Sequence, residues 1–211
     1  MNKEHKKFIA QAVALNYSEA MAEKVWSFIE RFAGYGFNKA HATSYAMIAY
    51  QTAYLKAHYP VEYMTALMSV ESASHSMNRD VKIAVAIETS KKMGIKIYPP
   101  DINKSDDDFI IEQDPHSLQG LAIRFGFNAI KHIGSQAIEN ILKVRRETGE
   151  FTSLTQFIHK TDGRKVNKTS LETLIKVGVM DQFGNRASML ESLELIRKNA
   201  EENNQRKISS K

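Results

Sequence analysis

A dense group of polar and basic side chains follows a two-glycine segment in the first quarter of the chain. The segment reads Gly34-Tyr-Gly-Phe-Asn-Lys-Ala-His-Ala-Thr-Ser-Tyr45, and an alanine-rich run that is typical of a helix continues from it. The first amide N–H groups of a helix have no acceptor within the helix, and the helix dipole makes that end positive. Lysine, histidine and free amides together can hold a phosphate. The stretch therefore predicts a site for a phosphate-bearing ligand.

Several of these side chains share one face of the predicted helix. His41, Ser44 and Tyr45 follow the spacing i, i+3, i+4, which brings residues to the same side of a helix. A cation at a helix start is mildly unfavourable to the helix dipole, so a bound anion would give a reason for Lys39. Core packing is an equally open interpretation for Phe37 and Tyr45. A capping hydrogen bond is the alternative for His41.

A second candidate site lies between two predicted helices in the second half of the chain. Ile130-Lys-His-Ile-Gly134 resembles the hairpin of a helix-hairpin-helix unit, although that unit usually has glycine where this chain has His132. Such a turn exposes backbone N–H groups that can bind a DNA phosphate without reading the base sequence. Arg164-Lys-Val-Asn-Lys168 is interpreted as a degenerate second copy without hairpin glycines. The residues predicted to contact DNA are Lys131, His132, Gly134, Lys143, Arg145, Arg146, Arg164, Lys165 and Lys168.

The elements that must position these residues are mainly helical. Apolar spacing and the glycines and prolines predict helices over 2–14, from Ser18 to Gly34, over 39–57, from Pro60 and over 80–93. The stripe of alanines from Ala42 to Ala57 would let a neighbouring helix approach closely, which predicts a central position for the third helix. Short strands are predicted over 95–98, 109–112 and 121–127. Later helices are expected to start near Ser135, Ser153, Thr169 and Asn185.

These elements predict a mainly α fold in several parts. A helical subdomain would cover residues 1–94, a small antiparallel β connector residues 95–127 and a helical domain residues 128–196. Residues 197–211 are polar and charged and are expected to form a tail or linker.

The composition narrows the class of protein. The chain has 211 residues and a net charge of +5, with +4 on residues 1–98, −4 on 99–127 and +4 on 128–180. The two basic regions favour a polyanionic partner, with an ordinary solvated surface as the alternative. Cysteine is absent, which excludes disulfides and thiolate metal sites. No apolar run is long enough to span a membrane and the start lacks a signal core, so a cytoplasmic protein is expected.

Metal-binding patterns are weak. The histidines are scattered, and no pair has the spacing of zinc ligands on one predicted helix. The carboxylate cluster Asp106-Asp-Asp108 lies between turn and strand signals, so it is interpreted as a solvated turn. The sequence predicts no metal site.

Four blocks together are family-specific. They are Phe37-Asn-Lys-Ala-His41, Tyr50-Gln-Thr-Ala-Tyr-Leu-Lys-Ala-His-Tyr-Pro60, Ile123-Arg-Phe-Gly-Phe-Asn-Ala-Ile-Lys131 and Arg164-Lys-Val-Asn-Lys168. In these blocks and in their order, roughly residues 1–196 resemble the C-family replicative DNA polymerases of bacteria, the DNA polymerase III alpha subunits. The resemblance implies that residues 1–94 are the C-terminal part of the fingers and residues 128–196 a tandem helix-hairpin-helix unit.

The resemblance also implies a function. Such polymerases extend a primer with deoxynucleotides, and Phe37, Lys39, His41, Ser44 and Tyr45 would form part of the incoming-nucleotide pocket. Two Mg²⁺ ions held by palm carboxylates act in the full polymerase. This chain has no match to the palm carboxylate motif, so we expect it to bind no cofactor and to be inactive alone. The implied partners are primer–template duplex DNA, a deoxynucleoside triphosphate, and, through the full-length chain, the sliding clamp and other replisome subunits.

Two other functions stay open. One is a non-enzymatic helix-hairpin-helix module that binds DNA, and the other is a helical protein–protein adaptor with incidental basic patches. A duplex binder loses affinity steeply as salt rises, whereas an adaptor shows no affinity for DNA that depends on its length.

Overall fold

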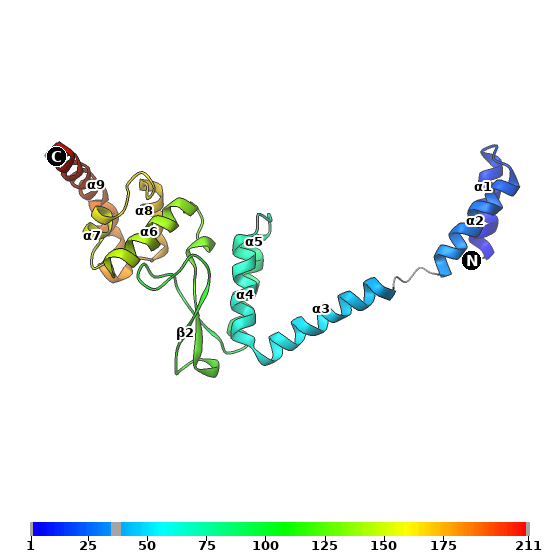
Figure 1. Cartoon of the computed structure of the whole chain (residues 1–211), viewed down its shortest axis with the longest axis horizontal. Helices are drawn as coiled ribbons and strands as arrows, with labels where there is room; N and C mark the ends of the chain where they lie inside the picture. Colours follow the sequence, from blue (N-terminus) through cyan, green and yellow to red (C-terminus); the bar gives the residue numbers. More distant parts are fainter. Residues whose placement is uncertain (1, 35–38, 210–211) are drawn as a thin grey trace. The chain divides into compact units, whose positions relative to one another are not determined.

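The computed structural model describes the backbone of residues 2–34 and 39–209 (Figure 1). Within these ranges the chain forms nine α-helices and one three-stranded sheet, which confirms the predicted mainly α class. The chain divides into two compact units, Met1–Leu55 and Lys56–Lys211.

The first unit begins with two helices that pack against each other, α1 (Asn2–Ala14) and α2 (Glu19–Gly34). Ser18 precedes α2, and its hydroxyl accepts a hydrogen bond from the amide of Met21 at 3.3 Å, as predicted for a cap. The rings of Phe8 and Trp26 lie 5.4 Å apart between the two helices. A histidine of α1, His5, bonds to a glutamate of α2 at 2.9 Å. Aromatic packing and this polar contact hold the pair together.

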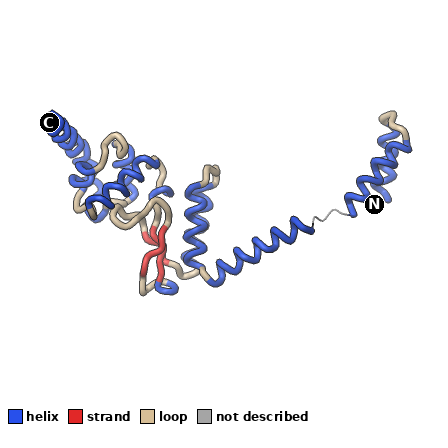
Figure 2. The backbone as a smooth tube through the Cα atoms, in the orientation of Figure 1, coloured by secondary structure: helices blue, strands red, loops and turns tan. Residues whose placement is uncertain are grey.

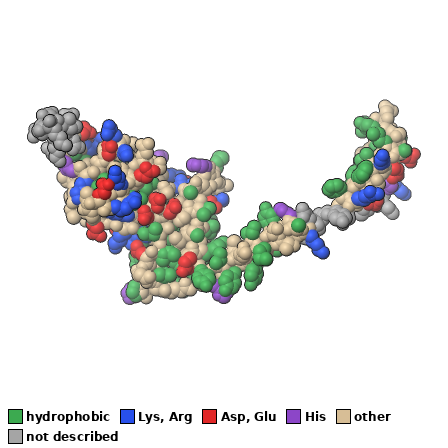
Figure 3. Space-filling model, in the orientation of Figure 1, with side chains coloured by type: hydrophobic (Ala, Val, Ile, Leu, Met, Phe, Trp, Pro, Cys, Tyr) green, Lys and Arg blue, Asp and Glu red, His purple; other side chains and the backbone are tan. Residues whose placement is uncertain are grey.

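The long helix α3 (Lys39–His58) has the predicted bounds. None of its residues is buried by the described residues of this chain. The predicted central position of this helix stays a prediction. Large apolar side chains along it are exposed, as the green surface of Figure 3 shows. They are Tyr45, Met47, Ile48, Tyr50, Tyr54 and Leu55.

The second unit contains a pair of helices that pack closely against each other, α4 (Pro60–Ala73) and α5 (Arg79–Lys92). Pro60 occupies the first turn of α4, where its missing N–H costs nothing. Gly94 follows α5 with φ of 79°, a left-handed backbone that favours glycine. Val61, Met64 and Met68 of α4 are buried against the sheet. These two helices and the sheet share one apolar core.

The sheet contains β1 (Lys96–Tyr98), β2 (Ile110–Gln113) and β3 (Leu121–Arg124) in the order β1-β3-β2 (Figure 2). Strands β2 and β3 are antiparallel, as predicted, but β1 and β3 are parallel. The prediction of a purely antiparallel sheet is therefore wrong at one pairing. The segment 99–109 connects β1 to β2, which lie on opposite sides of β3. It is long enough to cross the end of β3, so the two strands need not be neighbours. The most buried strand, β3, thus lies in the centre, and β1 pairs with its free edge.

The rest of the second unit is a helical body with its own core. It contains η2 (Phe127–Ala129), α6 (Ser135–Thr148), α7 (Leu154–Lys160), α8 (Lys168–Val177), η3 (Asp181–Phe183) and α9 (Arg186–Ser209). Phe127, Ile141, Phe157 and Leu174 are fully buried in its core. A further short turn, η1 (Leu118–Gly120), joins β2 to β3.

Capping explains where these helices begin. Ser153 accepts from the amide of Gln156 at 3.1 Å and Asn185 from that of Ala187 at 2.9 Å, so both predicted caps are confirmed. The predicted start near Thr169 is corrected, because Asn167 caps α8 by accepting from the amide of Ser170 at 2.9 Å. Ser135 is the first residue of α6, and Gly134 holds the cap position.

Helix α9 corrects the prediction of a polar tail or linker after residue 196. The helix continues to Ser209. Ala200 is buried in the core of the helical body, and α9 packs against α7 and α8. The turn that carries Ala200 is therefore part of the helical body. The other predicted boundaries, after residues 94 and 127, stay a prediction.

Candidate nucleic-acid interface

The first hairpin is the turn between η2 and α6, and apolar anchors hold it to the helical body. Ile130 is 6% exposed, and Ile133 packs against the same core. Between them Lys131 and His132 are exposed. The two isoleucines thus pack inward, and the two polar side chains between them point to solvent. Lys131 and His132 are therefore accessible to a ligand.

The backbone of this hairpin explains its residue types. His132 has φ of 64°, a left-handed conformation that strains any residue other than glycine. This is the position where a helix-hairpin-helix unit usually has glycine. Gly134 is extended and precedes α6, and no side chain of the described residues caps this helix start. No heavy atom of the described chain lies within 4 Å of the place where a Cβ of Gly134 would stand. Ser135 and Gln136, the first two residues of α6, are exposed, whereas the amide of Ala137 donates to the carbonyl of Gly134 at 2.9 Å.

The second turn, between α7 and α8, repeats this plan with different residues. Val166 is 1% exposed and anchors the turn, while Arg164 and Lys165 are exposed. The Asp162 carbonyl accepts from the amides of Lys165 at 2.9 Å and Val166 at 2.8 Å, which closes a turn that contains Gly163. The amide of Asp162 donates to the side chain of Asn140 on α6 at 2.9 Å. This bond ties the second turn to the helix that follows the first hairpin.

Two of the predicted DNA contacts form ion pairs with a carboxylate on another helix. The ammonium of Lys131 lies 2.6 Å from the carboxylate of Asp80, in the first turn of α5. The ammonium of Lys168 contacts the carboxylate of Glu194 on α9 and lies 4.0 Å from that of Glu172. Hydrogen bonding to Lys131 lowers the pKa of Asp80, and hydrogen bonding to Glu194 raises the pKa of Lys168. Both lysines remain more than half exposed.

Arg145 has a contact within the fold. Its Nη1 donates to the carbonyls of Ile102 at 3.0 Å and Ser105 at 2.7 Å. The side chain is half-buried, and desolvation lowers the pKa of its guanidinium. Arg145 therefore holds the 101–106 segment against α6. Whether it also contacts DNA stays a prediction.

The remaining cations on this surface are more available. Lys143 lies 3.8 Å from Glu147 on the same helix and is 69% exposed. Arg146 donates to the carbonyl of its own helix at Leu142. Arg164 lies 3.4 Å from Asp162 with its side chain 93% exposed. Figure 3 shows blue and red side chains intermingled over this part of the molecule.

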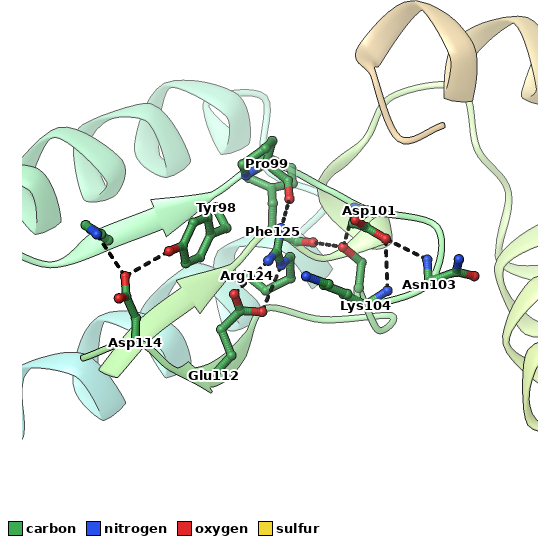
Figure 4. A network of polar contacts seen from close by, with 11 residues as sticks. Tyr98, Pro99, Asp101, Asn103, Lys104, Glu112, Asp114, Arg124 and Phe125 are labelled. Carbon is green, nitrogen blue, oxygen red and sulfur yellow. Dashed lines mark hydrogen bonds and ion pairs between the residues drawn. The ribbon is translucent and has the colours of Figure 1, made fainter. Parts of the chain in front are cut away.

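A polar network fixes the sheet and the segment that Arg145 holds (Figure 4). The guanidinium of Arg124 is 6% exposed, forms two hydrogen bonds with Glu112 at 2.9 and 2.6 Å, and donates to the carbonyl of Pro99 at 2.8 Å. The hydroxyl of Tyr98 donates to Asp114 at 2.8 Å. Asp101 accepts from the amide of Asn103 at 2.8 Å, which tightens the turn after the two prolines.

The predicted phosphate site at the start of α3 lies in the other unit. Lys39 is the first residue of α3 and is exposed. The rings of His41 and Tyr45 lie 4.4 Å apart in an edge-to-face arrangement, so they share a helix face as predicted. The hydroxyl of Ser44 donates to the carbonyl of Ala40 at 3.0 Å. Phe37 lies outside the described residues.

Within the described residues, no three histidine or acidic side chains come close enough to hold a metal ion. The carboxylates of the Asp106-Asp-Asp108 turn accept hydrogen bonds within the fold. Asp106 accepts from the amide of Asp107, and Asp107 from the amide of Asp108. These bonds are typical of a turn, and the interpretation of Asp106-Asp-Asp108 as a solvated turn stays a prediction.

Comparison with known proteins finds relatives that match most of this chain. A family model of the helix-hairpin-helix motif matches residues 94–189. The DNA polymerase III subunit alpha of Thermus aquaticus is 41% identical over 98% of this chain, which covers 16% of that protein. The chain is related to the DNA polymerase III alpha subunits. Those of Campylobacter jejuni and Borreliella burgdorferi are 46% and 36% identical over 84% and 99% of the chain, which covers 14% and 17% of them. The chain thus spans about one sixth of the length of these alpha subunits.

The sequence did not reveal the acidic partners of the hairpin lysines. Asp80 and Glu194 lie far along the chain from Lys131 and Lys168, and no local pattern links them. Asn140, which joins the two turns, was missed for the same reason. In the described part of the chain, no helix combines the length and apolar character needed to cross a bilayer.

Proposed function

We propose that this chain is the duplex-binding and nucleotide-facing part of a replicative DNA polymerase that extends a primer with deoxynucleotides. The first hairpin carries the proposal. Its apolar anchors face the core, and the first two residues of α6, which has no side-chain cap, are exposed close in sequence to Lys131 and His132. The relationship to the DNA polymerase III alpha subunits supports a polymerase as the whole protein.

The grip on DNA would be independent of sequence. Amides at a helix start and lysine ammonium groups both bind phosphate oxygens, which are the same at every base pair. The second turn adds Arg164 and Lys165 on an equally exposed surface. With two turns tied through Asn140, the unit would contact the backbone of one duplex at two places.

The start of α3 would face the incoming nucleotide. No acidic residue lies in its first turn to offset Lys39, so an anion there would gain from the lysine and from the helix dipole. Phe37, His41, Ser44 and Tyr45 would complete this side of the pocket. Any Mg²⁺ needed for the reaction would be held by residues of the whole polymerase outside this chain, and this chain alone would not extend a primer.

Salt dependence of DNA binding tests the first part. Reversal of Lys131, Lys165 and Lys168 to glutamate should weaken binding of short duplexes by a similar factor on any base sequence, as measured by fluorescence anisotropy. Each lost phosphate contact should reduce the slope of log K against log salt by roughly 0.9. Reversal of Lys3, Lys6 and Lys7 on α1 is the matched control and should change little. A loss confined to one base sequence would contradict the proposal.

Steady-state kinetics of the full polymerase test the second part. Lys39→Ala and His41→Ala should raise the KM for deoxynucleotides, because both remove groups facing the triphosphate. Lys56→Ala at the other end of α3 removes the same charge as a control. Unchanged nucleotide KM and turnover in both variants would reject the pocket. An adaptor function would instead be favoured if the chain showed no affinity for duplex DNA at low salt.

A further inference from the structure

Lys131, just before α6, and Lys168, at the start of α8, both form ion pairs that the DNA-binding proposal does not require. Each is paired with a carboxylate from a helix outside its own turn. Lys131 pairs with Asp80 of α5, and Lys168 pairs with Glu194 of α9. By contrast, Lys165 has no ion-pair partner within 4.0 Å among the described residues. The acidic partners thus occupy two specific cationic positions.

We propose that Asp80 and Glu194 act as internal competitors that lower the affinity of the two turns for DNA phosphate. This inference rests on the proposed duplex-binding function and concerns its regulation. A phosphate that approaches Lys131 or Lys168 meets an ammonium that already bonds to a carboxylate. It must displace that carboxylate or lie beside it, and two anions at one ammonium repel each other.

The competitors are held in place by the fold. Next to Asp80, the guanidinium of Arg79 donates to the carbonyl of Asn128 in η2, just before the first hairpin. The start of α5 is therefore fixed against the base of that hairpin. On α9, Leu193 is 2% exposed and anchors the helix turn that carries Glu194. The fold therefore keeps the backbone that carries each carboxylate within reach of its lysine.

The strength of the pairs suits competition rather than a permanent lock. The side chains of Lys131 and Asp80 are 65% and 48% exposed, and those of Lys168 and Glu194 are 51% and 63% exposed. Ion pairs at such exposure are weak and screened by salt, so a phosphate can displace them. The turns would keep modest affinity, which lets a duplex slide past them.

Neutralising the competitors tests the inference. Asp80→Asn and Glu194→Gln should each tighten binding of a short duplex by about 1.4- to 5-fold at low salt, which corresponds to the typical strength of an exposed pair. The two gains should multiply in the double variant, because the sites share no partner. The gain should shrink as salt rises.

Matched controls separate competition from a change in net charge. Glu88→Gln removes the same charge from α5, where Glu88 pairs with Lys91 at 3.1 Å, and Glu201→Gln does so on α9, where Glu201 pairs with Arg197. Neither should reproduce the gain. In a Lys131→Ala background, Asp80→Asn should have no effect on DNA affinity. Thermal unfolding should confirm that each variant is folded.

The outcomes distinguish this inference from the proposed function. DNA binding by the unmodified chain, with no gain in Asp80→Asn and Glu194→Gln beyond their controls, would overturn the inference alone. A gain that persists without Lys131 would also overturn it. Absence of duplex binding by the unmodified chain and every variant at low salt would overturn both.

Discussion

Arg145 offers a sharp test of the difference between a cation that can bind DNA and one that holds the fold. The sequence places it among the predicted DNA contacts, but the structure gives its Nη1 two carbonyl acceptors, those of Ile102 and Ser105. Both residues are fully buried. Arg145→Met keeps most of the aliphatic stem and removes the donor. We therefore expect this variant to lose stability and to keep most of its affinity for DNA.

The size of the loss follows from these contacts. A hydrogen bond from a charged donor contributes about 1.5–3 kcal/mol, and the two carbonyls of Ile102 and Ser105 would lose their donor together. Because Arg145 is only half-buried, water can partly replace the donor, so the lower end applies. We expect the free energy of unfolding to fall by about 2–3 kcal/mol. This corresponds to a drop of roughly 5–10 °C in the unfolding midpoint for a chain of this size.

The assay pairs unfolding with DNA binding in the same samples. Circular dichroism gives the unfolding midpoint, and anisotropy with a short duplex gives the affinity and its salt slope. Arg145→Lys keeps the charge but lacks the planar donor geometry, so it should also be destabilised. Lys165→Ala is the opposite control, with an unchanged midpoint and a salt slope reduced by roughly 0.9. If Arg145→Met kept its midpoint and lost DNA affinity as Lys165→Ala does, the reasoning would be refuted.

Three further predictions concern the fold around the interface. His132→Gly should raise the free energy of unfolding by about 0.5–1 kcal/mol in urea titrations, because glycine adopts the left-handed backbone without strain. Gly126→Ala should lower it by about 2–3 kcal/mol in the same assay, since the new Cβ would lie 2.3 Å from the backbone carbonyl carbon of Asp108. Hydrogen bonds from the His116 amide, Lys96 and Tyr98 lower the pKa of Asp114 from 3.8 to about 2. The ionised Asp114 carboxylate therefore stabilises the folded state above pH 3.8, and this contribution is lost as the pH falls toward 2. Asp114→Asn should make the unfolding midpoint less dependent on pH in this range.

Local signals predicted most of the elements. Pro60 and Gly94 mark ends that depend only on their own backbone chemistry, and the structure places both as expected. Ser153 and Asn185 cap their helices through bonds to residues two or three positions away. Such contacts depend on neighbours in the chain, so the sequence alone contains the information.

Long-range arrangements were not predictable in the same way. The parallel pairing of β1 with β3 joins segments that lie far apart in the sequence, and neither strand sequence specifies its partner. The alanine stripe of α3 indicated close packing, but it cannot specify a partner, and none of its residues is buried by the described residues of this chain. Spacing on one helix did predict that His41 and Tyr45 meet, because that contact is local.

The net charge of the helical body overstates the number of cations that are available to bind DNA. Residues 128–180 have a net charge of +4, yet Arg145 is used within the fold and Lys131 and Lys168 are paired. The amides at the start of α6 differ from these side chains, because no side chain of the described residues caps them. These backbone donors also remain when the three lysines are replaced by glutamate. We therefore expect the residual DNA affinity of the triple lysine reversal to reside in the first hairpin. Gly134→Pro removes one amide of that hairpin. Added to the triple lysine reversal, it should lower the remaining DNA affinity further in the anisotropy assay.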